Sequence, residues 1–122
     1  MNTFLTGIDH IQIVAPPGSE DIARSFYSEL LGMTELPKPE NLRVNGGCWF
    51  QCGLQEVHIG IQSDFTPAKK AHPGFTVNAP EKLKSALQTA GYIIDEELPI
   101  DGRSRFFTHD PFGNRLEFLA FD

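Results

Sequence analysis

The stretch IDHIQIVAPPGSEDIARSFYSELLGM, residues 8–33, starts with alternating side chains and continues with a helical pattern. Ile11 and Ile13 share one face of a strand that we predict over residues 7–15, and His10 and Gln12 share the other face. The two prolines and the glycine that follow cannot continue such a strand. The stretch therefore predicts a strand with one apolar face, a turn and then a helix.

The helix is marked at both ends. Ser19 is a suitable N-cap, and Gly32 can close the helix in a left-handed conformation. Between Ser19 and Gly32, the apolar residues Ile22, Phe26 and Leu30 recur at helical spacing. Three short strands are predicted after this helix, near residues 41–45, 47–52 and 55–62.

The second half of the chain repeats this order. A strand is predicted over residues 72–78, followed by a helix with Pro80 at its start and Gly91 at its end. Strands are then expected near residues 93–98, 103–109 and 114–121. The pattern is thus strand, helix and three strands, twice, in modules of about 7–62 and 72–121 with a link at 63–71. It indicates an internal duplication within a single α+β domain.

Composition narrows the function. The chain has 122 residues, of which 40% are hydrophobic and 21% charged, which is typical of one soluble domain. A net charge of −6 argues against nucleic-acid binding, and no apolar run is long enough to span a bilayer. We expect a cytoplasmic protein that binds a small molecule. Cys48 and Cys52, four positions apart on a predicted strand, are expected to be reduced thiols rather than a disulfide.

In each of four predicted strands, one side chain suited to metal binding lies on the face opposite the apolar one. These side chains are His10, His58, His72 and Glu117. The first two lie 48 positions apart (58 − 10) and the last two 45 (117 − 72), in matching places of the two halves. Imidazole and carboxylate groups bind Zn, Ni, Fe(II) or Mn, so the pattern indicates a divalent metal of this group. Glu56 is the substitute ligand if His58 does not bind, whereas His109, beside a turn, is expected to be structural or exposed.

These features resemble a known superfamily. The order of elements, together with the segments GIDHIQIV, FYSELLGM and DPFGNRLEFL, is similar to the vicinal oxygen chelate superfamily over nearly the whole chain. That superfamily includes glyoxalase I, methylmalonyl-CoA epimerase, extradiol dioxygenases, fosfomycin-resistance transferases and bleomycin-binding proteins. The resemblance implies paired βαβββ modules that form a cupped, partly open barrel of mixed strands. It also implies a homodimer with metal sites between modules.

The resemblance also suggests roles for individual residues. His10 matches the ligand on the first strand, His72 the ligand that opens the second module, and Glu117 the glutamate of the last strand. His58 falls where glyoxalase I-like members have glutamate and epimerases have glutamine, so this position departs from both. The resemblance implies that Glu117 is both a ligand and a general base. In a dimer, His10 and His58 of one chain would meet His72 and Glu117 of the other.

The reaction that the resemblance implies first is a metal-dependent lyase or isomerase reaction of glyoxalase type, in which the metal acts as a Lewis acid. Further residues on the same faces are candidates for substrate binding, namely Gln12, Trp49, Thr76, Arg105, Phe107 and Arg115. Two alternatives stay open, an extradiol-type iron(II) dioxygenase and a non-catalytic protein of the bleomycin-resistance type that sequesters a ligand. A fosfomycin-type transferase is disfavoured, because no basic residue follows Glu117.

Overall fold

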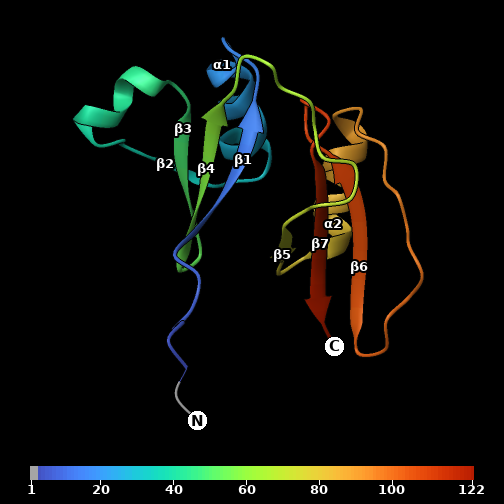
Figure 1. Ribbon diagram of the computed structural model, residues 1–122. Helices are drawn as coiled ribbons and strands as arrows, with labels where there is room; N and C mark the ends of the chain where they lie inside the picture. The colour runs from blue at the N-terminus through green and yellow to red at the C-terminus, as the bar shows by residue number, and fades with distance from the viewer. Residues whose placement is uncertain (1–2) are drawn as a thin grey trace. The chain divides into compact units, whose positions relative to one another are not determined.

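The computed structural model describes residues 3–122, and the chain divides into two compact α+β units between Ser63 and Asp64 (Figure 1). Each unit has its own sheet of mixed parallel and antiparallel strands, with helical segments between strands. The predicted α+β class is confirmed. None of the helices in the described part of the chain is long and apolar enough to cross a membrane.

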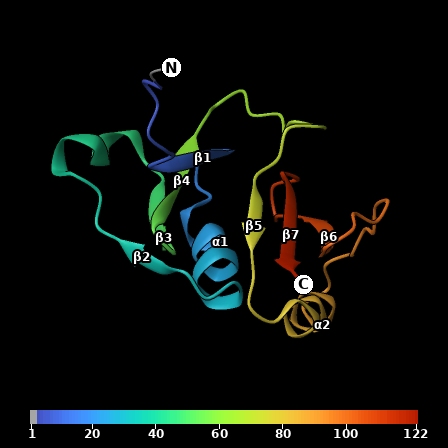
Figure 2. The same cartoon turned by 90° about the horizontal axis from the view of Figure 1, so that it is seen from below.

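The first unit contains a four-stranded sheet and three helical segments. In chain order these are β1 (His10–Ala15), α1 (Glu20–Ala23), the π-helix η1 (Arg24–Leu30), β2 (Thr34–Leu36), the 3₁₀ helix η2 (Glu40–Asn45), β3 (Cys48–Cys52) and β4 (Gln55–Ile61). The strand order is β1-β4-β3-β2. β1 and β4 run parallel and the other pairs antiparallel (Figures 1 and 2). A parallel pair needs a long crossover, which here contains the helices and two further strands.

One face of this sheet forms the core of the first unit. Its buried members alternate along the strands and meet buried side chains of α1 and η1, and together they are Ile13, Ala15, Ala23, Phe26, Tyr27, Cys48, Phe50, Val57 and Ile59. Full burial of one large apolar side chain stabilises a fold by about 1.5–3 kcal/mol. Because this face is needed for the core, the alternate positions, which include His10 and His58, are directed to the other face.

The first helix differs from the prediction in its buried stripe. α1 continues without a break into η1, where the N–H of Leu31 donates to the carbonyl of Phe26 at 2.9 Å, five residues back. Phe26 is buried as predicted, but its buried neighbours are Ala23 and Tyr27, and Ile22 is 53% exposed. Ser19 occupies the N-cap position, but its hydroxyl donates to the Pro16 carbonyl instead of capping the helix.

The predicted strand at 41–45 is wrong. Residues 40–45 form η2, in which the Leu42 N–H donates to the Pro39 carbonyl at 2.9 Å. The alternation of polar and apolar residues suggested a strand, but Val44 is 88% exposed and contributes nothing to a core. The missing strand is β2, which has only three residues and lies at the edge of the sheet. Three residues are too few to give an alternating pattern.

The second unit contains a three-stranded sheet and one helix. Its elements are β5 (Gly74–Thr76), α2 (Pro80–Thr89), β6 (Arg103–His109) and β7 (Arg115–Phe121). The strand order is β5-β7-β6, with β5 and β7 parallel and β6 and β7 antiparallel (Figure 2). The core again uses one face of the sheet, and its buried apolar members are Phe75, Leu87, Phe106, Leu116 and Phe118, with Phe107 and Leu119 buried on the opposite face.

Two strand predictions in the second unit need correction. The strand predicted over 72–78 is limited to β5, because Pro73 has no N–H to donate, and His72 therefore precedes the strand by two residues. The strand predicted over 93–98 is reduced to one isolated bridge, in which Asp95 and Phe107 exchange two backbone hydrogen bonds of 2.8 Å. The strands predicted near 103–109 and 114–121 are confirmed as β6 and β7.

The two units share the feature that matters for the site. In each, the first strand pairs in parallel with the last, β1 with β4 and β5 with β7. Residues far apart in sequence are therefore neighbours on one sheet face. The internal repetition read from the sequence is visible in this shared pairing.

Candidate functional site

The polar face of the first sheet brings His10 and His58 together. In the pairing of β1 with β4, Gln12 lies opposite His58 and His10 lies opposite Glu56, so the two histidines are diagonal neighbours. Their rings stack with centroids 4.1 Å apart and planes inclined by 16°. Strand parity thus places both candidate ligands of this unit side by side.

Trp49 covers the other side of the His58 ring. It lies opposite His58 in the pairing of β3 with β4, and the two rings are parallel within 1° at a centroid distance of 3.8 Å. His58 is therefore held between Trp49 and His10 and is only 5% exposed. Trp49 was expected to line a pocket, and in this structure it fixes the plane of an imidazole.

Each of these two imidazoles has one nitrogen bonded to a carboxylate. His10 Nδ1 lies 2.9 Å from Asp9 Oδ1, and His58 Nε2 lies 2.9 Å from Glu56 Oε1. Because an ionised carboxylate only accepts hydrogen bonds, these nitrogens carry protons. In the neutral rings, Nε2 of His10 and Nδ1 of His58 then have the lone pairs. Metal-binding histidines characteristically have such an oxygen partner on the other nitrogen.

Gln12 shares this face. A side chain at position 60 would conflict with it, because a Cβ added at Gly60 would lie 2.6 Å from Gln12 Nε2. Gly60 therefore leaves room for the Gln12 carboxamide to lie over β4. Gln12 is the residue of β1 that pairs with His58. A carboxamide in this place can donate to or accept from a ligand oxygen.

In the second unit, His72 and Glu117 form a direct pair. His72 Nε2 lies 2.9 Å from Glu117 Oε1, and His72 Nδ1 lies 2.9 Å from the Lys70 carbonyl, to which it donates. The backbone supports this contact, because the Glu117 N–H donates to the Pro73 carbonyl at 3.1 Å. His72 is thus positioned by the segment before β5 rather than by β5 itself.

Two arginines flank Glu117 on the same face of the second sheet. Arg105 Nη1 lies 3.5 Å from Glu117 Oε2, and Arg115 Nη2 donates to Glu97 Oε1 at 2.9 Å. Both guanidinium groups lie near the Phe107 ring, at 5.3 Å for Arg105 and 4.1 Å for Arg115. Such contacts between a cation and an aromatic ring are attractive. Phe107 itself is buried and pairs with Glu117 across the strands.

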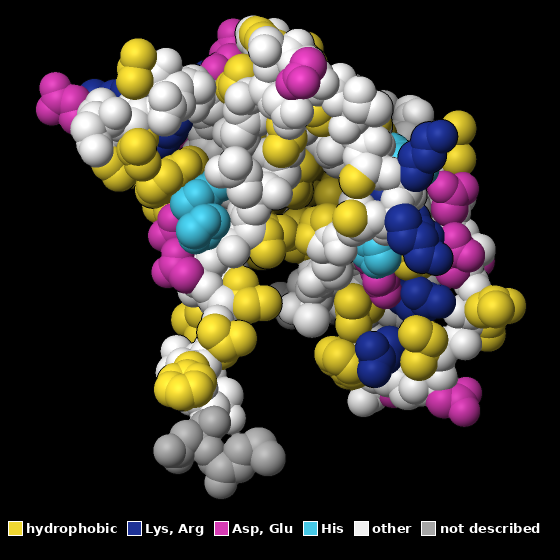
Figure 3. All heavy atoms as spheres, viewed as in Figure 1, with side chains coloured by type: hydrophobic (Ala, Val, Ile, Leu, Met, Phe, Trp, Pro, Cys, Tyr) yellow, Lys and Arg dark blue, Asp and Glu magenta, His cyan; other side chains and the backbone are white. Residues whose placement is uncertain are grey.

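The remaining candidates lie farther from these pairs. Thr76 is exposed, on the face of β5 that carries Gly74, which lies opposite Glu117. His109 lies at the end of β6 and is exposed, one of the two states expected for it. Figure 3 shows histidine side chains beside acidic groups on the first unit, and a histidine among Lys and Arg side chains on the second.

The structure therefore groups the four proposed ligands as two pairs, one in each unit. Among residues 3–122, no three His, Cys, Asp or Glu side chains form a group that could hold a metal ion. The donor chemistry nevertheless fits. Imidazole nitrogen and carboxylate oxygen are ligands that such metals accept, and His72 Nε2 and Glu117 Oε1 lie 2.9 Å apart. Each pair can supply part of a coordination sphere.

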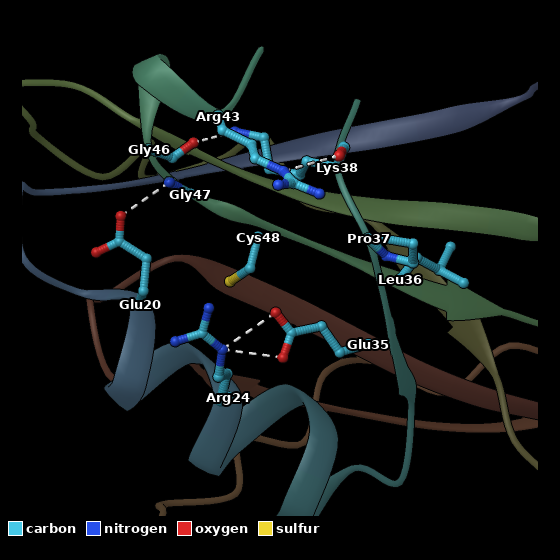
Figure 4. A pocket seen from close by; sticks show the side chains of 10 residues that line it. All are labelled: Glu20, Arg24, Glu35, Leu36, Pro37, Lys38, Arg43, Gly46, Gly47 and Cys48. Atoms are coloured by element: carbon cyan, nitrogen blue, oxygen red, sulfur yellow. Dashed lines mark hydrogen bonds and ion pairs between the residues drawn. The ribbon is translucent and has the colours of Figure 1, made fainter. Parts of the chain in front are cut away.

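A separate pocket of about 330 Å³ lies on the helix side of the first sheet (Figure 4). It is lined by Glu20, Arg24, Glu35, Leu36, Pro37, Lys38, Arg43, Gly46, Gly47 and Cys48. None of the candidate site residues is among them. The pocket is therefore a distinct feature of the first unit.

The charged groups of this pocket bind one another or the backbone. Arg24 Nε donates to both Glu35 oxygens at 2.9 and 3.1 Å (Figure 4). The Gly47 N–H donates to Glu20 Oε2 at 2.8 Å and holds the pKa of Glu20 below its ordinary value. Burial raises the pKa of the Cys48 thiol to about 11, so this free cysteine is a poor nucleophile. These contacts tie η1 to β2 and α1 to the residue that precedes β3.

Sequence reasoning missed the partners that orient the imidazoles. Asp9 and the Lys70 carbonyl were not predicted, and Glu56 was considered only as a substitute ligand. Asp9 had a visible signal, since it directly precedes His10 in the sequence. The Lys70 carbonyl had none, because any residue supplies a carbonyl group.

Comparison with known proteins places these observations in context. The family model described as Glyoxalase/Bleomycin resistance protein/Dioxygenase superfamily matches residues 7–118. The comparison with curated proteins gives no significant match. A solved structure of a glyoxalase family protein from Bacillus anthracis is 47% identical, with a TM-score of 0.95 and full coverage of both chains.

Two further solved structures are more distant. A glyoxalase family protein from Enterococcus faecalis is 26% identical, with a TM-score of 0.74 and coverage of 96% of this chain and 99% of that one. A lactoylglutathione lyase from Agrobacterium tumefaciens is 17% identical, with a TM-score of 0.74 and coverage of 97% and 96%. At that identity, the second likeness concerns the fold alone.

Proposed function

Because the chain belongs to the glyoxalase/bleomycin resistance protein/dioxygenase superfamily, we propose that it is a metal-dependent lyase or isomerase of glyoxalase type. Its substrate would be a small molecule that presents two adjacent oxygens to a divalent metal, such as Zn, Ni, Fe or Mn. The superfamily also contains proteins with other activities, so the proposal depends on the residues of this chain.

The contact between His72 Nε2 and Glu117 Oε1 carries the proposal. With its Nδ1–H donated to the Lys70 carbonyl, a neutral His72 has its lone pair on Nε2, directed at a carboxylate oxygen 2.9 Å away. Two electron-rich atoms at this distance need a cation between or beside them, either a proton or a metal ion. This pair therefore supports a site that attracts a cation.

The four residues that would hold the metal are His10, His58, His72 and Glu117. A bound divalent metal would act as a Lewis acid and favour removal of a proton next to a substrate carbonyl. Glu117 would take that proton, since its side chain is 13% exposed and can reach a small substrate. Gln12 would orient the substrate through its carboxamide, and Phe107 would exclude water beside Glu117.

We further propose that two copies of the chain assemble so that the pair in the first unit of one copy meets the pair in the second unit of the other. This arrangement would give each site four ligands, two from each chain. A cytoplasmic location suits such a protein, because both cysteines are free thiols, which a reducing compartment maintains.

A second function, an extradiol-type iron(II) dioxygenase, is favoured by the surroundings of His58. Its Nε2 is bonded to Glu56, and its ring is enclosed between Trp49 and His10. If this enclosure keeps His58 from the metal, then His10, His72 and Glu117 remain. Two histidines and one carboxylate with open positions are the ligand set of non-haem iron(II) oxygenases.

Both proposed functions require a bound divalent metal. Metal analysis of protein purified without a tag tests this requirement. We expect close to one metal per chain, lost in His72→Ala and retained in the control His109→Ala. No metal in the purified protein and no binding of added Zn, Ni, Fe or Mn would contradict both and favour a ligand-sequestering protein. Exchange of the proton next to the carbonyl of hydroxyketones with solvent deuterium would identify the first function, and oxygen uptake with catechols the second.

A further inference from the structure

Only some of the hydrogen-bond donors of the Arg105 guanidinium group have a partner within the protein. Its Nη2 donates to the Leu98 carbonyl at 2.7 Å, and its Nη1 lies 3.5 Å from Glu117 Oε2, beyond the length of a good hydrogen bond. Its Nε is buried and has no hydrogen-bond partner within the described chain. A buried donor without a partner is destabilising, so a partner from outside the chain would be favourable.

The sheet holds Arg105 beside the proposed base. Along β6 and β7, Phe107 pairs with Glu117. Arg105 pairs with Leu119 on one side of this pair, and Arg115 pairs with His109 on the other side. The two guanidinium groups thus flank Glu117, and both lie near the Phe107 ring. Their side chains are 17% and 18% exposed, so each group is held in place but still reaches solvent.

The charges on this face are not balanced. Arg115 is paired with Glu97 at 2.9 Å, whereas the carboxylate that faces Arg105 at 3.5 Å is that of Glu117, which is already bonded to His72. If Glu117 binds a metal, its charge is shared with that metal and Arg105 has no full counter-charge. This occurs in a chain whose net charge is −6. Lys and Arg side chains gather on the visible face of the second unit (Figure 3).

The segment around Leu98, next to Arg105, is loosely attached, so it can move to admit a ligand. Leu98, whose carbonyl accepts from Nη2, is 82% exposed, and the backbone on either side of it pairs with β6 through isolated bridges rather than a continuous strand. An oxyanion with two oxygens can bind the Nε edge of a guanidinium through two parallel hydrogen bonds, a geometry that a lysine cannot provide. The orphaned Nε is one half of such an edge.

We propose that Arg105 binds an oxyanion of the substrate, a carboxylate or a phosphate, beside Glu117, with Arg115 adding a second positive charge. The inference rests on the proposed function for the identity of the site, and it adds that the substrate is an acid rather than a neutral molecule. Arg105 would set the direction in which the rest of the substrate points toward Glu117.

Binding of simple anions to the full-length protein tests this directly. Calorimetry would be carried out with sodium lactate, with sodium phosphate and with lactamide, which is neutral but otherwise similar to lactate. We expect lactate or phosphate to bind at least tenfold more tightly than lactamide, and the stronger of the two identifies the oxyanion. Equal affinity for all three, or no binding of any, would overturn the inference.

Variants then assign the binding to one residue. Arg105→Gln should weaken the preferred anion at least tenfold, and Arg105→Lys should restore only part of the affinity, because lysine retains the charge without the two-pronged edge. Arg103→Gln is the matched control, since Arg103 is exposed on the same face of the same strand. Unchanged affinity in Arg105→Gln would overturn the inference. The melting temperature of each variant shows whether a loss reflects unfolding, and Arg105→Lys provides the test if Arg105→Gln does not fold.

Metal content, measured on the same samples, separates this inference from the proposed function. Anion binding that depends on Arg105 in a protein that takes up no metal would contradict the proposed function and support the anion site. Normal metal binding with anion affinity that does not depend on Arg105 would contradict the anion site alone.

Discussion

The indole of Trp49 and the imidazole of His58 lie face to face, 3.8 Å apart and parallel within 1°. Trp49 is the single tryptophan of the chain. Its fluorescence therefore comes from one ring that touches one proposed ligand. A change in the charge or bonding of His58 should alter this emission.

Addition of zinc should produce a saturable change in Trp49 emission if His58 binds the metal. The His72→Ala variant should lose the change, because removal of one ligand weakens the site, and His109→Ala should behave as wild type. Metal binding seen by calorimetry without a change in emission would exclude His58 as a ligand. That outcome would favour the three-ligand set of the dioxygenase.

Glu117→Gln should lower metal affinity by roughly 100-fold or more, since it removes the one charged ligand, and loss of a mere orienting partner already costs 10–100-fold. Competition with a coloured chelator measures the affinity. Glu97→Gln is the control, because Glu97 is a carboxylate of the same unit that binds Arg115 rather than His72. Equal effects of the two substitutions would indicate general electrostatics instead of ligation.

Asp9→Asn should weaken metal binding by about tenfold, the lower end of the range for residues that orient a ligand. The effect is expected to be modest because the Asp9 side chain is 88% exposed and its bond to His10 competes with water. Asp21→Asn, a similarly exposed acid on α1, serves as the control. The same chelator competition applies, and an unaltered affinity would mean that Asp9 does not orient His10.

Gly47→Ala should destabilise the protein far more than Gly53→Ala, although both glycines have positive φ, +86° and +58°. A Cβ at Gly47 would lie 2.0 Å from the Ile59 carbonyl oxygen, whereas one at Gly53 meets open space. We expect a loss of about 1 kcal/mol for Gly53→Ala from backbone strain and about 3 kcal/mol or more for Gly47→Ala. Chemical denaturation measures both, and equal losses would contradict the close approach of β3 to β4.

Acid should weaken the first unit through Glu20. Its pKa is lowered in the folded state, chiefly by the Gly47 N–H, so its contribution to stability is present above its ordinary pKa of 4.5 and is lost as pH falls through the lowered pKa. Glu20→Gln should therefore reduce stability near pH 6 and flatten the decline in melting temperature below pH 4.5. Glu29→Gln, an exposed residue on η1, should leave the pH profile unchanged.

The alternation of side chains was sufficient to predict most of the fold. It identified β1, β3, β4, β6 and β7, because each buries one face and so leaves a period of two in the sequence. It failed at residues 41–45, where the same period occurs without burial. It also missed β2, which is three residues long, and it did not predict the π-helix or the exposure of Ile22.

The sequence was sufficient to predict which candidate ligands lie together in pairs. Parity and the repeat put His10 with His58 and His72 with Glu117, and the parallel pairing of first and last strands gives these contacts their basis. The orienting partners were not predictable, since backbone carbonyls and acids near the donors carry no periodic signal. Nor did the sequence show that the Arg105 Nε would be buried without a partner.

The parallel pairing of first and last strands also has a consequence for folding. His10 and His58 meet only when β1 closes against β4, so the chain must complete a loop of about fifty residues before this contact forms. Such long-range pairings slow folding, because the entropy of the loop is lost before the contacts form. A chain emerging from the ribosome would thus have no pair of donors until the last strand of a unit had been made, and premature capture of metal by a half-made unit would be avoided.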